Sequence, residues 1–303
     1  MLDVSARSLS ELKEDLRSLN WSAVVPLRVW RDDRFWKLGW VRWLAFLAFF
    51  PLALSKFFSR DVSLDDAAWA LGAYFALLWC LILYRCLQPG TVDLGKIVFS
   101  AGFTVVVGMT LLLAAQKLPG IKHLYAATEV PDPLPRIIGY VLGVGVLEET
   151  TKVLPLYWLF IHRKNPTTVR RTAFLGCISG LAFGVDEAVM YSLGYAADVS
   201  GGRFGFGRYL VVQILRLISL PLLHALWAGV TGYFVGLAAT FPARARALIV
   251  VGVGGVAVLH GFYDVFSSGW IGVALGVLSL MLFLGYARST DYVTANFEPK
   301  SGS

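Results

Sequence analysis

The sequence predicts an all-α polytopic membrane protein with about eight transmembrane helices, and two observations carry this prediction. Hydrophobic residues make up 57% of the 303 residues and charged residues only 16%, whereas soluble domains average roughly 45–50% and about 25%. The hydrophobic residues also gather in runs of about 20, the length that crosses the bilayer core as a helix. A soluble enzyme, a disordered chain and a disulfide-stapled secreted domain are therefore excluded.

Eight apolar runs qualify as transmembrane helices. In order along the chain they cover residues 38–58, 66–87, 94–116, 134–161, 168–197, 209–238, 245–267 and 270–287. The chain is thereby divided into a cytoplasmic or interfacial N-terminal segment, helices one to three with an outer loop, a core of helices four to seven, which the residues described below mark as catalytic, and helix eight with a cytoplasmic tail. These parts are residues 1–37, 38–133, 134–267 and 268–303.

The N-terminal segment contains a helix signal of its own. Ser8 and Glu11 form a capping-box pattern ahead of leucines at helical spacing. We expect either an amphipathic helix that rests on the membrane surface or a solvated helix.

Basic residues are distributed unequally between the two sides of the predicted membrane domain. Of the 27 Lys and Arg residues, seventeen fall in the N-terminal segment, the tail and the alternate loops between them, and seven in the other loops. Because cytoplasmic loops carry the excess of Lys and Arg, we expect both termini in the cytoplasm and the loop 117–136 outside, in a bacterial inner membrane. The net charge of +7 does not indicate a nucleic-acid partner, because the basic residues are spread between the apolar runs and do not form one cluster.

Ionisable residues inside the predicted helices are the strongest functional signal, because each costs at least ~2.5–3.5 kcal/mol at the bilayer centre. Helices four to seven carry Glu148, Glu149, Lys152, Asp186, Glu187, Arg216, His224, His260 and Asp264. Most of these carboxylates and histidines lie at a similar depth, roughly 21–24 Å from the cytoplasmic anchor of their helix at 1.5 Å per residue. This layer predicts one water-accessible site between four helices.

Spacing within single helices supports one cluster. Glu148 lies four residues before Lys152 and Glu149 three residues before it, so all three share a helix face. His260 and Asp264 are also four residues apart. A carboxylate one turn from a histidine fixes its tautomer, which both metal ligands and catalytic bases need.

Carboxylates and imidazoles in a wet pocket support two kinds of hydrolytic chemistry. They can bind a divalent metal and lower the pKa of its water, or a glutamate can activate water directly while a histidine stabilises the oxyanion. The HExxH pattern of many zinc proteases is absent from the sequence. Arg216 is expected to neutralise a buried carboxylate.

Four motifs in order resemble the PrsW family of intramembrane proteases, over roughly residues 134–267. They are EExxK from Glu148, FxxxE ending at Glu187, HALWxGxxG from His224 and HGFYD from His260. The family is distantly similar to the CAAX prenyl endopeptidases and to bacteriocin-processing enzymes, which usually show EExxxR, FxxxH and HxxxN instead. One departure is Ala188, where the family often has Asn after the Glu of its second motif.

The resemblance implies hydrolysis of peptide bonds in membrane-anchored proteins, in or near the lipid bilayer. It implies either a metalloprotease, with zinc as the expected divalent ion, or a metal-free glutamate mechanism. We expect Glu149 or Glu148 to be the base that activates water, and His224 and His260 with Glu187 to hold the metal or the oxyanion. Asp264 would orient His260, and Lys152 would restrain the two glutamates.

Two other classes of function remain open from the residues alone. A transporter or channel with an intramembrane ion-pair network would explain the charges, but not why two histidines and a glutamate pair lie at one depth. A membrane scaffold without catalytic activity is the third class, and its effect in cells would survive the substitution Glu149→Ala.

Overall fold

The computed structural model describes residues 31–39, 41–43, 45–46, 48–49, 63–202 and 205–296, and all regular elements within them are helices. The chain divides into two units, Met1–Asp61 and Val62–Ser303. In the first unit the structure describes the short helix α4 (Asp33–Lys37). The capping box predicted near the N-terminus lies outside the described residues, and so does most of the predicted span 38–58.

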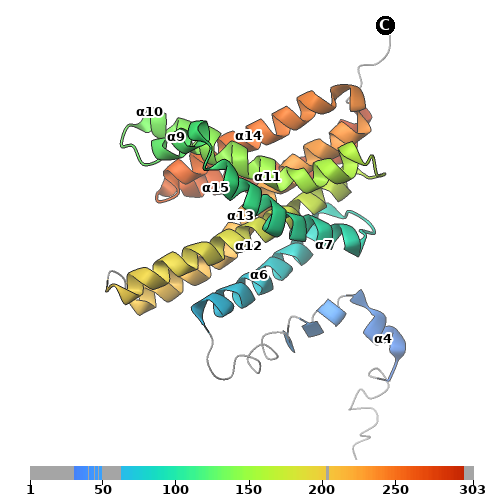
Figure 1. Ribbon diagram of the computed structural model, residues 1–303. Helices are drawn as coiled ribbons and strands as arrows, with labels where there is room; N and C mark the ends of the chain where they lie inside the picture. The colour runs from blue at the N-terminus through green and yellow to red at the C-terminus, as the bar shows by residue number, and fades with distance from the viewer. Residues whose placement is uncertain are drawn as a thin grey trace, which may run out of the picture. The chain divides into compact units, whose positions relative to one another are not determined.

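The second unit is a bundle of helices (Figure 1). Several of them follow one another without a break, and three short stretches are π-helical. In chain order the elements are α6 (Leu64–Leu87), α7 (Leu94–Gly102), η1 (Phe103–Gly108), α8 (Met109–Ala115), α9 (Pro119–Ala127), α10 (Pro133–Ile138), η2 (Gly139–Gly145), α11 (Val146–Leu156), η3 (Tyr157–His162), α12 (Val169–Ser200), α13 (Phe206–Thr240), η4 (Pro242–Arg244), α14 (Ala245–Phe266) and α15 (Trp270–Asn296).

Six stretches of the described chain are long and apolar enough to cross a bilayer. They are Asp66–Leu87, Leu94–Ala115, Val169–Ser192, Leu210–Thr240, Pro242–Phe266 and Trp270–Thr290. Each agrees within a few residues with one of the eight predicted helices, so the chain is an integral membrane protein with an all-helical membrane domain.

The predicted count of eight is not confirmed, and the fourth predicted helix shows why. Residues 134–161 fold as four consecutive segments, α10, η2, α11 and η3, instead of one continuous α-helix. The third of these segments, α11, carries three charged residues, Glu148, Glu149 and Lys152, within five positions. The predicted outer loop 117–136 also contains α9 and most of α10, which begin at Pro119 and Pro133, the position where proline is favoured in a helix.

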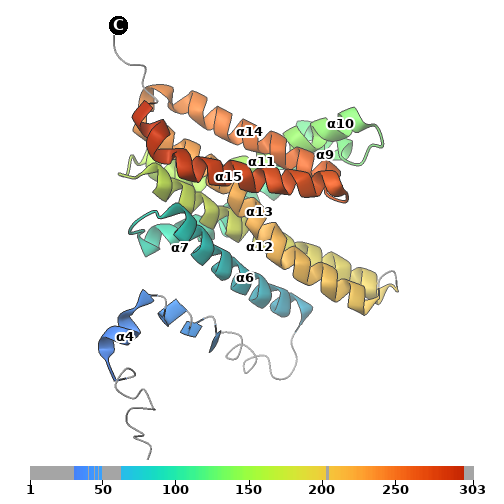
Figure 2. The same cartoon turned by 180° about the vertical axis from the view of Figure 1, so that it is seen from behind.

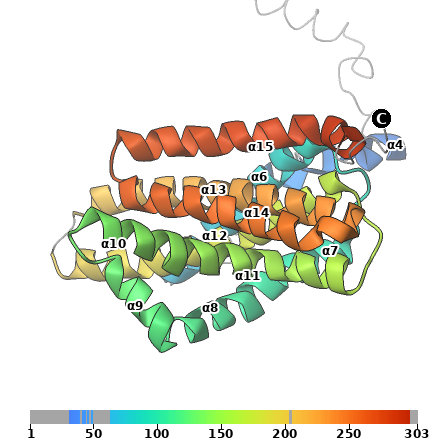
Figure 3. The same cartoon turned by 90° about the horizontal axis from the view of Figure 1, so that it is seen from above.

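The helix that carries the charges lies inside the bundle. α11 contacts α12, α13 and α14, and Figure 3 shows it between α8 and α9 at one edge and α15 at the other. α12 and α13 run side by side, as both Figure 1 and the reverse view in Figure 2 show. Residues from four helices are thereby brought to one place.

Three glycines determine how closely α12 approaches α13. Gly176, Gly180 and Gly184 recur at every fourth residue of α12 and face α13. A Cβ atom on Gly180 would overlap the backbone oxygen of His224. Small residues at this spacing let membrane helices pack backbone against backbone, and here they bring Glu187 of α12 to His224 of α13.

We expect Gly180→Ala to destabilise the protein and to reduce its activity, because α12 must move away from α13 to accommodate the methyl group. Overpacking of this kind costs typically ~1–3 kcal/mol. Gly194→Ala on the same helix is the matched control, since a Cβ atom there meets nothing within 4 Å. Thermal unfolding in detergent measures both variants, and equal melting temperatures would contradict the close packing.

Candidate active site

The sequence-predicted site residues lie together in the bundle. α11 supplies Glu148, Glu149 and Lys152, α12 supplies Glu187, α13 supplies His224, and α14 supplies His260 and Asp264. Every one of them has another member of the group within 4.0 Å.

Lys152 is the buried centre of the cluster. Its Nζ atom lies 2.8 Å from Oε1 of Glu149, 3.4 Å from Oε2 of Glu148 and 2.7 Å from Nδ1 of His224. Nζ also lies 4.2 Å from the centre of the Phe183 ring. A lysine is almost never fully buried unless it is paired, and this one holds both glutamates and one histidine in place.

His260 is held by Glu149. Nδ1 of His260 lies 2.9 Å from Oε1 of Glu149, so Nδ1 donates its proton to that carboxylate, and in the neutral ring Nε2 keeps its lone pair. Nε2 lies 3.4 Å from Oδ2 of Asp264 and 3.8 Å from Oε2 of Glu148. The expectation that Asp264 orients His260 stays a prediction: Asp264 lies beside Nε2 of the ring, whereas Nδ1 donates its hydrogen bond to Glu149 of α11.

His224 and Glu187 form an unusual pair. Nε2 of His224 lies 2.6 Å from Oε2 of Glu187, yet the two atoms are not aligned as a hydrogen bond, and neither has another hydrogen-bond partner among the described residues. Buried polar atoms are normally hydrogen-bonded. Because the ammonium of Lys152 donates to Nδ1 of this ring, Nε2 of the neutral imidazole carries the proton and lies against the carboxylate oxygen of Glu187.

A set of metal-ligating groups lies at the same place. Glu148, His224 and His260 are buried, and one ligand atom from each lies within 4.8 Å of the others. Two imidazoles and one carboxylate, with further positions open, form a donor set found in catalytic zinc sites. The ligand set expected from the sequence, His224 and His260 with Glu187, stays a prediction, and Glu187 lies 2.6 Å from Nε2 of His224.

The cluster opens into a cavity of about 720 Å³. Glu148, Glu187, His224, His260 and Asp264 line it, whereas Glu149 and Lys152 are not among its lining residues. The side chain of Glu148 keeps 10% of its surface exposed, and that of Glu149 keeps 0%. Of the two adjacent glutamates, Glu148 is therefore the one that water and substrate can reach.

Several lining residues were not indicated by the sequence. Tyr125 of α9 lines the cavity, and its hydroxyl accepts a hydrogen bond from Nε2 of Gln116 at 2.9 Å. Both belong to the region at and beyond the end of the third predicted helix, which carried no signal. Arg216 also lines the cavity. Its guanidinium stacks on the Tyr191 ring and donates to the Tyr195 hydroxyl. Contrary to the expectation from the sequence, it forms no ion pair with a carboxylate among the described residues.

A comparison with protein families now bears on this geometry. Residues 93–287 match the model of the PrsW family of intramembrane metalloproteases. The chain belongs to the PrsW family. The match covers α11 to α14, the helices that carry all seven predicted site residues. Among curated proteins and among solved structures, no match was found.

PrsW-family membership confirms the resemblance seen in the four sequence motifs and extends it beyond residues 134–267. The protein is an intramembrane peptidase. A transporter or a channel is accordingly not favoured, because the buried charges form a site of hydrolytic composition in a family of proteases.

Proposed function

We propose that this PrsW-family peptidase hydrolyses peptide bonds of membrane-anchored proteins inside the cavity between α11, α12, α13 and α14. The observation that carries the proposal is the buried Glu148–His224–His260 set, which faces a cavity of about 720 Å³. The surrounding helices cross the bilayer, so a substrate anchored in the same bilayer can present its chain to this cavity.

The residues present fit a divalent metal, and zinc agrees best with their donor atoms. Glu148, His224 and His260 would hold it, and the lone pair on Nε2 of a neutral His260 suits such a role. When bound, the metal would polarise the scissile carbonyl and lower the pKa of an attacking water.

The other site residues then have separate roles. Glu187 lines the cavity with an oxygen that lacks a hydrogen-bond partner, and it accepts the proton that the attacking water loses and passes it to the leaving amide nitrogen. Glu149 positions His260 through Nδ1, as carboxylates commonly do for metal-ligating histidines. Lys152 balances the charge of both glutamates.

Cleavage in a defined membrane tests the proposed function. The purified protein is reconstituted into vesicles with a peptide that carries one transmembrane anchor and a fluorophore on its extramembrane end. We expect fragments whose masses locate one cut near the membrane surface, and Glu148→Gln should produce none. Ion or solute flux across the vesicle wall without any fragment would contradict the proposal.

The proposed orientation places both termini in the cytoplasm of a bacterial cell and α9 outside. The support is the asymmetry of Lys and Arg between the two sides of the membrane. We expect Lys122→Cys on α9 to react with a membrane-impermeant maleimide in intact cells, and a cysteine added at either terminus to react only after lysis. Reaction of both terminal cysteines in intact cells would reverse the orientation.

A further inference from the structure

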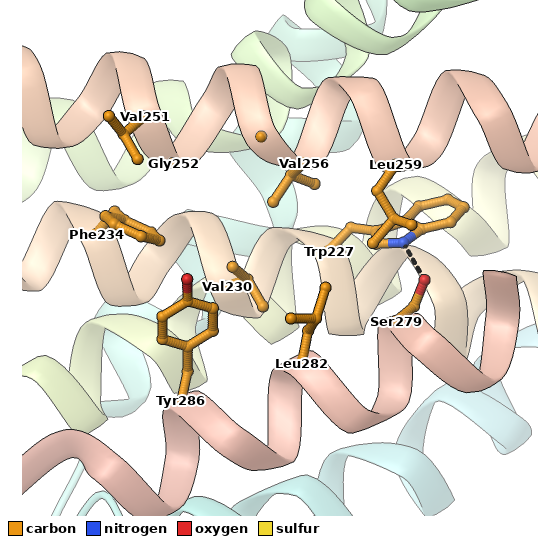
Figure 4. A pocket seen from close by; sticks show the side chains of 11 residues that line it. Trp227, Val230, Phe234, Val251, Gly252, Val256, Leu259, Ser279, Leu282 and Tyr286 are labelled. Carbon is orange, nitrogen blue, oxygen red and sulfur yellow. Dashed lines mark hydrogen bonds between the residues drawn. The ribbon is translucent and has the colours of Figure 1, made fainter.

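An apolar pocket of about 180 Å³ lies between α13, α14 and α15, on the other side of Trp227 from the active-site cavity. Figure 4 shows side chains from all three helices converging on it. Trp227, Val230 and Phe234 come from α13, Val256 and Leu259 from α14, and Leu282 and Tyr286 from α15. It shares no lining residue with the active-site cavity.

The pocket adjoins the catalytic histidines through one side chain. The Trp227 ring stacks on His260, with ring centroids 4.2 Å apart and an angle of 24° between the planes. Its edge-on contact with His224 has a centroid distance of 5.4 Å. Nε1 of Trp227 donates to Oγ of Ser279 on α15 at 2.9 Å, the dashed line in Figure 4. Whatever fills the pocket therefore packs on the indole that supports His260.

The pocket opens toward the bilayer. Val251 and Leu282 line it and are 59% and 40% exposed, and both lie on stretches long and apolar enough to cross the membrane. Its surface is thus continuous with the lipid-facing surface of α14 and α15. An apolar cavity of about 150 Å³ stays dry and accepts an apolar guest, and lipid tails are as apolar as leucine.

We propose that this pocket binds an acyl chain of a membrane phospholipid, which packs against Trp227 behind the active site. A side chain of the substrate is a poorer occupant, because the scissile bond must reach the cavity on the opposite side of Trp227. A second copy of the chain is poorer too, since a pocket of about 180 Å³ is too small for a helix and accepts at most part of one apolar chain.

Two adjacent glycines of α14 give a matched pair of variants. A Cβ atom on Gly254 or on Gly255 meets nothing within 4 Å, so the backbone accommodates leucine at both. Only Gly255 lines the pocket. Gly255→Leu therefore fills the pocket, whereas Gly254→Leu adds the same volume next to it.

The probe is phosphatidylglycerol with a diazirine at the end of one acyl chain, in vesicles of phosphatidylethanolamine and phosphatidylglycerol. Labels on buried residues decide the result, because Trp227 and Val256 are 1% and 5% exposed and lipid outside the pocket does not reach them. Val250, which is 69% exposed, is the internal standard for lipid around the protein.

We expect labelled Trp227 and Val256 in the wild type, a several-fold loss of that labelling relative to Val250 in Gly255→Leu, and no change in Gly254→Leu. Leu282→Trp, which fills the pocket from α15, must give the same loss, so that a folding defect in one variant does not decide the outcome. Labelling that is absent from the wild type, or equal in all variants, would overturn the proposal. Labelling of Val250 in the wild type without labelling of Trp227 or Val256 would overturn it in favour of another occupant.

Discussion

Replacing Glu148 with glutamine should abolish cleavage while leaving the protein folded. Glutamine keeps the volume of the side chain but removes the charge that can hold a metal ion or a water molecule at the cavity wall. Positioned groups of this kind contribute ~10²–10⁴-fold to a rate, so we expect the rate of reporter cleavage to fall by about that factor. Initial rates in proteoliposomes and thermal unfolding in detergent measure the two properties separately.

Glu129→Gln is the matched control for the Glu148 variant. Glu129 is an exposed glutamate that lines the same cavity but lies outside the metal-ligating set, so its variant should cleave at nearly the wild-type rate. Glu149→Gln adds a second comparison. If it abolished cleavage while Glu148→Gln kept more than about a tenth of the rate, Glu149 instead of Glu148 would be the glutamate that holds the metal ion or the water molecule, and the proposed roles of the two adjacent glutamates would be exchanged.

Lys152→Met should have the largest effect on stability. The substitution leaves the carboxylate of Glu149, which is 0% exposed, without the cation that now lies 2.8 Å away. Removing one partner of a buried ion pair costs ~3–5 kcal/mol. We expect a much lower melting temperature in detergent, whereas Lys122→Met on the exposed part of α9 should change it little.

A compensating double variant identifies the cause of that loss. Lys152→Met combined with Glu149→Leu removes both charges of the Lys152–Glu149 pair and leaves Glu148 in place. Replacement of a buried pair by apolar residues is often neutral or stabilising. We expect the double variant to regain part of the stability that Lys152→Met loses, without regaining activity. If the double variant were less stable than Lys152→Met alone, burial of an uncompensated charge would not explain the effect.

Most of the membrane helices could be predicted because they are set by local composition. The stretches Val169–Ser192 and Trp270–Thr290 are apolar runs that polar residues bound, and their ends agree with the prediction within a few residues. Residues 134–161 could not be predicted in the same way. Their π-helical stretches η2 and η3 have more residues per turn than an α-helix, so the α-helical spacing does not continue through them. The three charged residues of α11 are also stabilised by partners on other helices, which the local sequence does not reveal.

The composition of the site could be predicted, but the pairing inside it could not. Lys152 with the two glutamates follows from spacing on one helix. The contacts of Lys152 with His224 and of Glu149 with His260 cross between helices, and they depend on how each helix is rotated about its axis. One signal was available, the glycines at every fourth residue from Gly176 to Gly184, which indicate where α12 meets a neighbour.

The metal content of the purified protein tests most directly the claim that Glu148, His224 and His260 form a metal site. Elemental analysis should find about one zinc ion per wild-type chain, as three protein ligands with an open position imply. His260→Ala and His224→Ala should lose both metal and activity. Glu149→Gln and Asp264→Asn, which alter groups at the two nitrogens of His260, should weaken metal binding by ~10–100-fold. Chelation should inactivate the wild type, and added Zn²⁺ should restore it.

Wild-type protein that cleaves its substrate at full rate with no detectable metal would contradict the metal site and leave Glu148 to activate water while the histidines hold the oxyanion.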